Sequence, residues 1–406
     1  MRAIRFAFVN QYAFPDEAAT AQLLADLVGA CREAGAECLV VCSGRSYSNP
    51  SRRYSGEEVI DGIRYSRSAA TGFGRSHSLG RVADYATFLT GALWRLLSGP
   101  RPDAIVGMST PPILGAMAVL AARFRGCRSA YWAMDVYPDL AFALGVIRPA
   151  GLAGRAFGAL SRWTLREADL VIALGDTMAG RLRDLGGGNV VAVHNWGDGH
   201  AIRPMPADSS SWRRARGWDR RLSVVYSGNM GMAHEFETLL DAAEQLGSEA
   251  RFAFVGGGPR RVEVEEGAAR RRLSNVEFHA AVQREDLGDL LVAGDLHVVT
   301  LRPGMPGLLV PSKLYGILAA GRPVVYVGPA EGEAYEVVSR SGCGTCLANG
   351  DATGLSETLR RYGSDPDRRV EEGRRARVVF EANFTKEGQT AKLVAMLTAL
   401  TGLGAK

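Results

Sequence analysis

One short segment combines a helix start, a lysine and a helix stop in a pattern that suits an anion. It begins at Val310 and carries Ser312 and Lys313 before ending at Gly321 and Pro323. Ser312 is a favoured N-cap residue, and Gly and Pro mark the end of a helix. Because an ammonium group adds its charge to that of the free amides at a helix start, Lys313 is predicted to bind a phosphate. Only four of the 48 basic residues are lysines, and this is the first along the chain. The alternative is an ordinary solvated charge.

Three glycine-rich loops are suited to the same kind of ligand. Each follows a strand-like run in the second half of the chain, at residues 227–231, 256–259 and 303–307. Glycine permits close approach of the backbone to a ligand, so the loops together predict a nucleoside diphosphate site. No GxGxxG opens the first domain and no GxxxxGK[ST] occurs, which excludes the usual NAD and P-loop sites. The loop residues expected at the ligand are Gly228, Asn229, Gly231, Gly257 and Gly304.

One aspartate in the first half of the chain is placed to act on a hydroxyl group. Asp135 follows a strand-like run and precedes Pro138, so it is expected at the carboxyl end of a strand, where parallel sheets bind ligands. From there it could orient or deprotonate an acceptor hydroxyl. It could equally cap the next helix.

The other groups that could do chemistry are interpreted as structural. His194 and His234 are expected to be structural rather than catalytic. Asp365–Asp367 has the spacing of a metal-binding DxD but lies in a polar stretch between helical segments, so it is predicted to be a turn. Cys343–Cys346 is a single CxxC without a second pair, which favours packing over zinc or redox use. Neither a metal nor a cofactor is expected.

The elements that must position these residues alternate between strands and helices in two series. Strands are predicted at residues 4–9, 37–42, 104–108, 129–134 and 170–173, then at 222–226, 252–255, 276–279, 296–301 and 324–327, with helices at 18–34 and 235–246. Such alternation predicts an α/β protein with two doubly wound parallel sheets. Residues 193–211 between them are rich in Gly, Pro, Asp and Ser, as expected of a hinge.

Composition indicates a soluble globular protein. The chain has 406 residues, of which 47% are hydrophobic and 22% charged. It contains no apolar run long enough for a membrane span or a signal peptide, so it is expected in the cytoplasm. The net charge of +5 suits an anionic substrate or an anionic membrane surface and is too weak to indicate nucleic acid.

The segment from Leu79 to Leu97 has apolar residues at helical spacing. One interpretation is a helix packed on the sheet. The other is contact with the inner face of the cell membrane, serving a lipid-linked acceptor. The second interpretation depends on the flanking arginines, which are Arg75, Arg81, Arg95 and Arg101.

These motifs resemble the retaining nucleotide-sugar glycosyltransferases of family 4. The similarity is strongest in Val310–Pro323 and includes Gly228–Gly231, the Gly256 loop and Asn275–Phe278. In the first half it rests on residues 103–112, Asp135–Pro138 and Asn195-Trp196, so it covers nearly the whole chain. The most similar branch builds bacterial surface polysaccharides and attaches aminosugars of the N-acetylfucosamine type.

The resemblance implies a GT-B fold, with two Rossmann-like domains facing a cleft. Residues 201–385 would hold an NDP-sugar donor, with UDP as the expected nucleotide, and residues 1–200 would hold a sugar or lipid-linked acceptor. A helix within residues 386–406 would return to the first domain. The residues expected on the acceptor side are Asn10, Thr20, Ser109 and Asp135.

The chain departs from the family's pattern at four positions. The two glutamates of the family's E-x7-E pattern align with Leu308 and Gly316, and its donor-binding Arg and Lys align with Asn229 and His234. The diphosphate charge is therefore expected to fall on Lys313, on helix amides beside Ser312, and on Arg302 or Arg322. The sugar contacts are left open, with Glu331 and Glu333 as candidates.

The resemblance predicts a retaining, metal-independent glycosyltransferase with Lys313 and Asp135 in catalytic roles. Electrostatic stabilisation of the leaving diphosphate would allow front-face attack by the acceptor without a protein nucleophile. Two alternatives remain: an NDP-sugar 2-epimerase on the same fold, and a non-catalytic subunit that binds sugar nucleotides.

Overall fold

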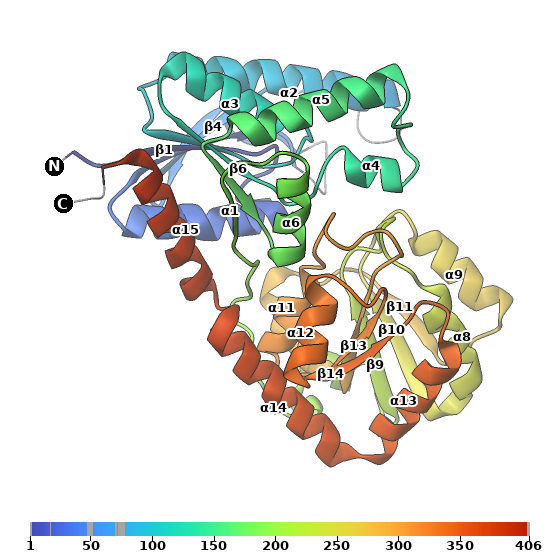
Figure 1. Cartoon of the computed structure of the whole chain (residues 1–406). Coiled ribbons are helices and arrows are strands. Elements are labelled where there is room, and N and C mark those ends of the chain that lie inside the picture. Colours follow the sequence, from blue (N-terminus) through green and yellow to red (C-terminus); the bar gives the residue numbers. More distant parts are fainter. Residues whose placement is uncertain (1, 17, 47–51, 70, 72–77, 404–406) are drawn as a thin grey trace. The chain divides into compact units, whose positions relative to one another are not determined.

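The computed structural model describes the chain except for residues 1, 17, 47–51, 70, 72–77 and 404–406, and it divides into two compact units (Figure 1). Unit 1 comprises Met1–His194, Gly307–Leu309 and Glu387–Lys406, and unit 2 comprises Asn195–Pro306 and Val310–Lys386. The chain therefore passes between the units at four places.

Unit 1 is built on an eight-stranded sheet in the order β3-β4-β2-β1-β5-β6-β7-β8. Only the β3–β4 pair is antiparallel. The strands are β1 (Arg5–Val9), β2 (Glu37–Ser43), β3 (Glu57–Ile60), β4 (Ile63–Ser68), β5 (Ala104–Gly107), β6 (Arg128–Trp132), β7 (Leu170–Ala173) and β8 (Val190–Ala192). The central strands are apolar and buried on both faces, as in other parallel sheets that helices cover on both sides.

The helices of unit 1 lie on both faces of this sheet, with α2, α3 and α5 on one side and α1 on the other (Figure 1). They are α1 (Ala19–Glu33), α2 (Ser78–Ser98), α3 (Leu114–Arg125), α4 (Asp139–Ala143), α5 (Leu152–Glu167), α6 (Asp176–Asp184) and, from Glu387 onward, α15 (Lys386–Thr401). The side of α2 toward the sheet carries Phe88, Ala92 and Leu96, which are buried with residues of α3. The interpretation of Leu79 to Leu97 as a helix packed on the sheet is therefore correct for one side of that helix. Arg75 and the side chain of Arg81 lie outside the described residues.

Unit 2 is built on a six-stranded parallel sheet in the order β11-β10-β9-β12-β13-β14. The strands are β9 (Leu222–Ser227), β10 (Ala250–Val255), β11 (Val276–His279), β12 (Leu296–Thr300), β13 (Val324–Val327) and β14 (Gly344–Leu347). The helices are α7 (Ser211–Ala215), α8 (Glu237–Leu246), α9 (Arg261–Arg270), α10 (Leu287–Ala293), α11 (Lys313–Ala319), α12 (Glu333–Ser341), α13 (Ala352–Ser364) and α14 (Pro366–Asn383), and the short 3-10 helices are Ala207–Ser209, Gly247–Glu249 and Arg284–Asp286. The two doubly wound sheets predicted from the sequence are confirmed.

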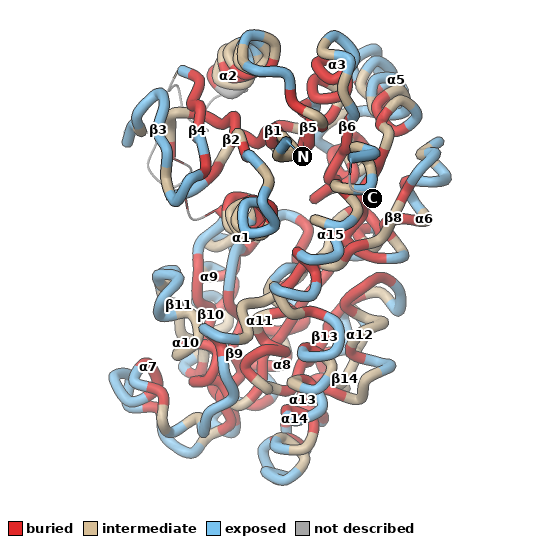
Figure 2. Tube along the Cα trace, turned by 90° about the vertical axis from the view of Figure 1, so that its left-hand side faces the viewer, coloured by how far each residue is buried: buried red, intermediate tan, exposed pale blue. Residues whose placement is uncertain are grey.

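Both faces of the second sheet are packed. On one face, Tyr226, Phe252 and Phe254 of the strands pack with α8, α9 and α13. On the other, Val225 and Ala253 pack with α7 and α10. Figure 2 shows these strands as continuous buried segments. The strand ends are therefore the part of the sheet left for a ligand.

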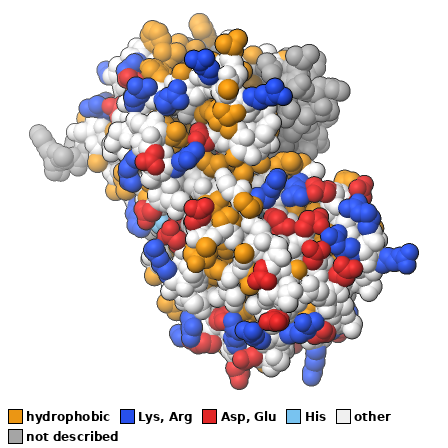
Figure 3. All heavy atoms as spheres, turned by 45° about the vertical axis from the view of Figure 1, so that its right-hand side comes forward, with side chains coloured by type: hydrophobic (Ala, Val, Ile, Leu, Met, Phe, Trp, Pro, Cys, Tyr) orange, Lys and Arg blue, Asp and Glu red, His pale blue; other side chains and the backbone are white. Residues whose placement is uncertain are grey.

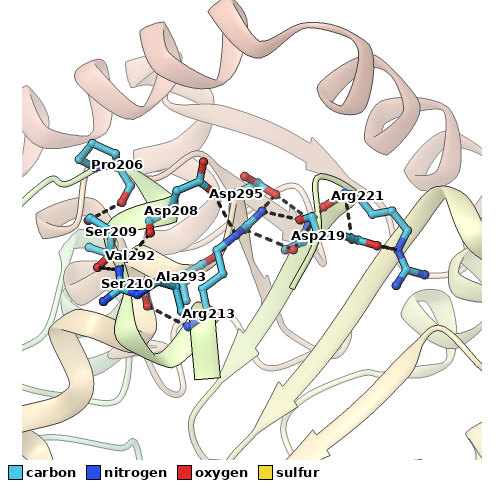
Figure 4. Close-up of polar contacts among 12 residues, drawn as sticks. Pro206, Asp208, Ser209, Ser210, Arg213, Asp219, Arg221, Val292, Ala293 and Asp295 are labelled. Atoms are coloured by element: carbon cyan, nitrogen blue, oxygen red, sulfur yellow. Dashed lines mark hydrogen bonds and ion pairs between the residues drawn. The ribbon is translucent and has the colours of Figure 1, made fainter. Parts of the chain in front are cut away.

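A buried arginine fixes the segment that leads into unit 2 (Figure 4). The guanidinium group of Arg213 donates to the carbonyl oxygens of Ala293 and Asp219, both at 2.9 Å. It also lies 3.5 Å from carboxylates of Asp208 and Asp295. The residues after Ser210 are thus tied to α10 and β12, and only the part before them resembles the predicted hinge.

No helix in the described part of the chain is long and apolar enough to cross a membrane.

Candidate functional site

The order of strands in unit 2 reverses between β9 and β12, which are neighbours in the sheet. In doubly wound sheets a crevice for ligands forms at such a point, outside the carboxyl ends of the strands. The loop that follows β9 begins with Gly228, and Lys313 lies beside it: a Cβ built on Gly228 would be 3.8 Å from the Lys313 Nζ atom. The structure therefore brings two of the predicted site residues together.

The Lys313 ammonium group is buried without a compensating charge among the described residues. Its Nζ atom lies 3.4 Å from the centre of the Tyr226 ring and has no hydrogen-bond partner in the part of the chain that the structure describes. Burial lowers the pKa of Lys313 well below its usual value. Since an uncompensated buried charge is costly, the group gains stability when an anion binds beside it.

The helix start around Lys313 differs in one respect from the prediction. Helix α11 begins at Lys313 and Ser312 occupies the N-cap position, but its side chain makes no capping hydrogen bond and its backbone is helical. The Ser312 side chain is exposed. Gly321 ends the helix with a φ of +62°, as the sequence indicated.

His234 is held as a neutral ring in the same region. Its Nδ1 atom lies 2.7 Å from the carbonyl oxygen of Thr300, so Nδ1 carries the proton. Burial, reinforced by the charge of Lys313, lowers the pKa of His234 to about 3. The position that carries a lysine in family 4 is thus uncharged here, and the structure places positive charge on Lys313 instead.

Two glycines pack the first two loops against each other. A Cβ at Gly256 would overlap the carbonyl oxygen of Gly228, and one at Gly258 would lie 2.6 Å from the Asn229 Oδ1 atom. Both glycines have φ near +135°. Gly257, the glycine predicted to meet the ligand, differs because a Cβ there would meet no atom within 4 Å. Its carbonyl oxygen accepts a hydrogen bond from the Met230 amide.

The third loop and its arginine lie at the surface. Arg302 and Gly304 are exposed, and Gly304 has a φ of +78°. The Arg302 backbone amide donates to the carbonyl oxygen of Ala233, which connects this loop to the loop after β9. Arg322, the other arginine considered for the diphosphate, instead donates to the carbonyl oxygens of Met205 and Val292 and is half-buried. That suggestion was wrong, because both bonds hold Arg322 to backbone elsewhere in unit 2.

The two positions of the missing family glutamates are accounted for by packing. A Cβ at Gly316 would lie 3.1 Å from Leu291 and 3.9 Å from Ile202, so a side chain there meets an apolar surface. Leu308 is buried in unit 1, where its carbonyl oxygen accepts a hydrogen bond from the Val136 amide. Of the two proposed replacements, Glu333 is buried at the first residue of α12, whereas Glu331 is exposed.

Unit 1 has a corresponding reversal of strand order at β1 and β5. Asn10 follows β1, Ser109 comes shortly after β5, and Asp135 comes shortly after β6, which pairs with β5. The Ser109 hydroxyl oxygen accepts hydrogen bonds from the amides of Met134 at 3.1 Å and Asp135 at 3.3 Å. Three of the predicted acceptor-side residues therefore lie at neighbouring strand ends.

Asp135 is half-buried, and loss of solvation raises its pKa to about 6. Its backbone forms a bridge with Leu309. The following helix, α4, has Pro138 at its N-cap and no side-chain cap, so the capping interpretation of Asp135 was wrong. A carboxylate with a pKa near 6 can accept a proton at neutral pH more readily than an ordinary aspartate.

Two buried amide side chains beside these residues have unused acceptor atoms. The Asn10 Nδ2 atom donates to the Tyr12 carbonyl oxygen at 2.7 Å and lies 3.4 Å from the Thr20 hydroxyl, while its Oδ1 atom has no partner among the residues described. Within the same described residues, the Oε1 atom of Gln11 is likewise buried without a partner. Gln11 was missed by sequence reasoning, although its place directly after β1 was a usable signal.

The remaining candidates make contacts within the fold. His194 Nδ1 lies 3.4 Å from the carbonyl oxygen of Leu174, and the Asp365 side chain caps α14. Cys343 is buried and Cys346 half-buried. Within the described part of the chain, no group of three His, Cys, Asp or Glu side chains could hold a metal ion.

The two residues predicted to be catalytic, Asp135 and Lys313, belong to different units.

Both halves of the chain match models of glycosyl transferase domains. Residues 19–196 match a glycosyl transferase 4-like domain and residues 221–365 match the glycosyl transferases group 1 model. A probable glycosyltransferase of Pseudomonas aeruginosa, WbjE, is 25% identical over 65% of this chain and 67% of its own length. A putative colanic acid biosynthesis glycosyl transferase of Escherichia coli, WcaI, is 28% identical over 62% of this chain. This chain spans 64% of the length of WcaI.

Solved structures share the fold over nearly the whole chain. Sucrose-phosphate synthase from Thermosynechococcus elongatus is 17% identical, with a TM-score of 0.77 over 98% of this chain and 100% of its own. HepE from Anabaena, solved in complex with UDP and glucose, is also 17% identical, with a TM-score of 0.75 over 98% of this chain and 100% of its own. The architecture is GT-B: two Rossmann-like α/β domains, each with a mainly parallel sheet.

Proposed function

We propose that this chain, which carries a glycosyl transferase 4-like domain followed by a glycosyl transferases group 1 domain, is a retaining glycosyltransferase that uses a nucleoside diphosphate sugar. The observation that carries the proposal is the Lys313 ammonium group, which is buried against Tyr226 at the β9–β12 reversal and has no hydrogen-bond partner among the described residues. A diphosphate would supply the negative charge and the hydrogen-bond acceptors that a buried ammonium group needs. The UDP found in HepE supports UDP as the nucleotide.

In the proposed reaction, the bond between the anomeric carbon and the diphosphate oxygen breaks and the diphosphate leaves with the electron pair. Lys313 stabilises the charge that develops on it. The acceptor hydroxyl attacks from the same face, and its proton passes to the leaving diphosphate, so the anomeric configuration is retained. Asp135 orients the acceptor hydroxyl, with Asn10, Thr20 and Ser109 around it, and no metal ion takes part.

We also infer the setting of the reaction from the relatives. WcaI is named for colanic acid biosynthesis, which supports a place in the assembly of surface polysaccharides. The resemblance to the aminosugar branch of family 4 supports an aminosugar donor, and a sugar or lipid-linked acceptor is proposed with it. Glu333 is the carboxylate proposed to contact the donor sugar, because it is buried at the start of α12.

The test is donor binding and turnover in Lys313→Ala beside Lys392→Ala, which changes an exposed lysine of α15. Titration calorimetry with UDP and a panel of UDP-sugars should show affinity falling by roughly 10- to 100-fold in Lys313→Ala, since a charge-assisted contact is lost. Lys392→Ala should bind like the unaltered protein. Equal affinities in all three proteins would contradict the proposal.

Product analysis of the same reactions separates the alternatives. A glycosyltransferase hydrolyses its donor slowly without acceptor and transfers the sugar when one is supplied. An epimerase would return an altered UDP-sugar, and a binding subunit would bind without turnover. Activity should persist in EDTA, and its loss there with recovery in magnesium would contradict the metal-independent mechanism.

A further inference from the structure

The outward side of three helices in unit 1 is apolar. A groove of about 480 Å³ is formed there by side chains of α2, α3 and α5 together with Ile113. Figure 3 shows hydrophobic and basic side chains gathered at the top of this unit. We refer to this surface as the outer apolar face, and its principal members are Trp94, Leu120, Phe124, Leu152, Leu160 and Trp163.

The extent of this face is unusual for a surface that stays in water. In the described part of the chain, six of the fifteen exposed large apolar side chains lie on α2, α3 and α5 or, as Ile113, directly before α3. Trp94, Phe124 and Leu152 are 68%, 71% and 88% exposed. Contiguous apolar surface of this kind marks an interaction site.

Helix α3 shows most directly that a partner is missing. Its inward side buries Leu114, Ala118 and Ala121, yet its outward side carries Leu120 and Phe124. A helix with large apolar side chains on two opposite sides normally has both of those sides covered. Here one side is covered by the sheet and the other is exposed.

The same three helices account for the net positive charge of the molecule. Helices α2, α3 and α5 contain seven arginines and two carboxylates, a surplus equal to the formal net charge of +5 of the whole chain. Both carboxylates are engaged, because Asp84 accepts from the Thr71 hydroxyl and Glu167 pairs with Arg123. The rest of the chain is therefore electrically balanced.

Helix α5 places charge and apolar surface side by side. Arg155, Arg162 and Arg166 are exposed and share one stripe of the helix. Leu152, Leu160 and Trp163 form the neighbouring stripe. This pairing is typical of helices that lie in the interface of a membrane, where arginine stems cover apolar surface and their heads reach lipid phosphates.

We propose that the outer apolar face docks onto an anionic lipid bilayer, with Trp94, Leu120, Phe124 and Leu152 in the boundary between head groups and acyl chains. Indole rings suit this depth because one end of the ring is polar. A second copy of the chain is a poorer partner, since pairing two such faces would bring their arginine stripes together. An anionic bilayer instead complements them, and each basic residue near its surface raises affinity about fivefold.

The experiment is co-sedimentation of the full chain with vesicles of phosphatidylcholine alone and of phosphatidylcholine with phosphatidylglycerol. We expect binding to the anionic vesicles that weakens as salt is added. Leu120→Ser combined with Phe124→Ser should lower the affinity at least about tenfold. Replacing Arg155, Arg162 and Arg166 together by Gln should lower it about a hundredfold.

The matched control is Val370→Ser on α14, which removes an apolar side chain that is 73% exposed and should bind vesicles like the unaltered chain. UDP affinity should be unchanged in every variant, which separates this inference from the donor site. Equal binding to both kinds of vesicle, no binding to either, or an equal loss in Val370→Ser would overturn it. So would a dimer in light scattering that the Leu120 and Phe124 changes disperse.

Discussion

Asp135 combines two properties that oppose each other. Its half-buried position raises its pKa to about 6, which makes its carboxylate a stronger hydrogen-bond acceptor for a hydroxyl group but a poorer contributor to stability near neutral pH. Because the folded pKa lies above the unfolded value near 3.8, the folded state binds this proton more tightly. Its contribution to stability is therefore fully present below about pH 4 and is lost as the pH rises through about 6.

We expect Asp135→Asn to separate these two effects. Turnover should fall by about 10²-fold because the hydroxyl is no longer positioned, while the melting temperature at pH 8 should rise, because an ionised half-buried group is removed. In the unaltered protein the rate should decline below about pH 6, and this acid limb should be absent in the variant. The measurements are a pH–rate profile and thermal unfolding at pH 4 and 8.

An acid limb that persists in Asp135→Asn would assign the ionisation that limits the rate to another residue. Proportional loss of donor affinity and turnover would make Asp135 part of the donor site. Asn preserves the size of the side chain, so a loss of folding is not expected to obscure either result.

The glycines of the donor loops offer a second prediction at this scale. Gly256→Ala should destabilise the protein by about 2 kcal/mol or more, because its φ of +135° and the nearby Gly228 carbonyl oxygen exclude a side chain. Gly257→Ala, with open space around it, should change stability by less than about 0.5 kcal/mol. Urea unfolding checks both values.

The same pair of variants tests the assignment of Gly257 to the donor. If a bound diphosphate approaches this backbone closely, Gly257→Ala weakens UDP binding while stability is unchanged. Unaltered UDP affinity in that variant would remove Gly257 from the site and leave the loop glycines with a packing role only.

At the scale of helices and strands, most of the elements that position the site could be predicted from apolar runs and helix stop signals in the sequence. Strands β7, β11 and β13 begin and end where predicted. Strand β14 was missed because Gly344–Leu347 is only half-buried and has polar members. The β3–β4 hairpin was also missed, although Asp61-Gly62 between its strands, both at positive φ, is a recognised turn signal.

The contacts that give Lys313 its character could not be read from the sequence. Its burial depends on Tyr226 of β9, which lies 87 positions earlier and meets it only through the strand order β9–β12. Arg213 had no distinguishing feature either, being one of many arginines in an arginine-rich chain. The kind of chemistry that Lys313 could perform was predictable from its residue type. Whether its charge, or that of Arg213, has a partner could be seen only in the tertiary fold.

Arg213 leads to a prediction about the segment that enters unit 2. Arg213→Met should destabilise unit 2 by about 3 kcal/mol, because the carboxylate of Asp295 and two backbone carbonyl oxygens lose a buried partner. Arg221→Met, which breaks the more exposed pair with Asp219, should cost less than about 1 kcal/mol. Urea unfolding should show the difference, and equal costs would contradict a structural role for the buried site.

At the scale of the whole molecule, unit 1 depends on the end of the chain. Helix α15 buries Leu393 and Leu397, and from Glu387 onward it belongs to unit 1. Leu393→Ala should therefore destabilise unit 1 by about 2–5 kcal/mol, whereas Lys392→Ala at the neighbouring exposed position should have little effect.

Hydrogen exchange read by mass spectrometry can assign that loss to one unit. Amides of β1, β5 and β6 should exchange faster in Leu393→Ala, while those of β9 and β12 should be unaffected or change much less. Equal acceleration in both units would mean that they unfold as a single cooperative body and that the last helix supports both.

The return of the last residues to unit 1 also sets an order of events during synthesis. Multidomain chains commonly fold from the N-terminus as they leave the ribosome. Here residues 5–192 emerge first, but their unit still lacks Gly307–Leu309 and the helix after Glu387. All of unit 2 is translated before that helix appears. The first unit to emerge is therefore the last to be completed, and a nascent chain stalled before Glu387 exposes the surface that Leu393 and Leu397 would cover.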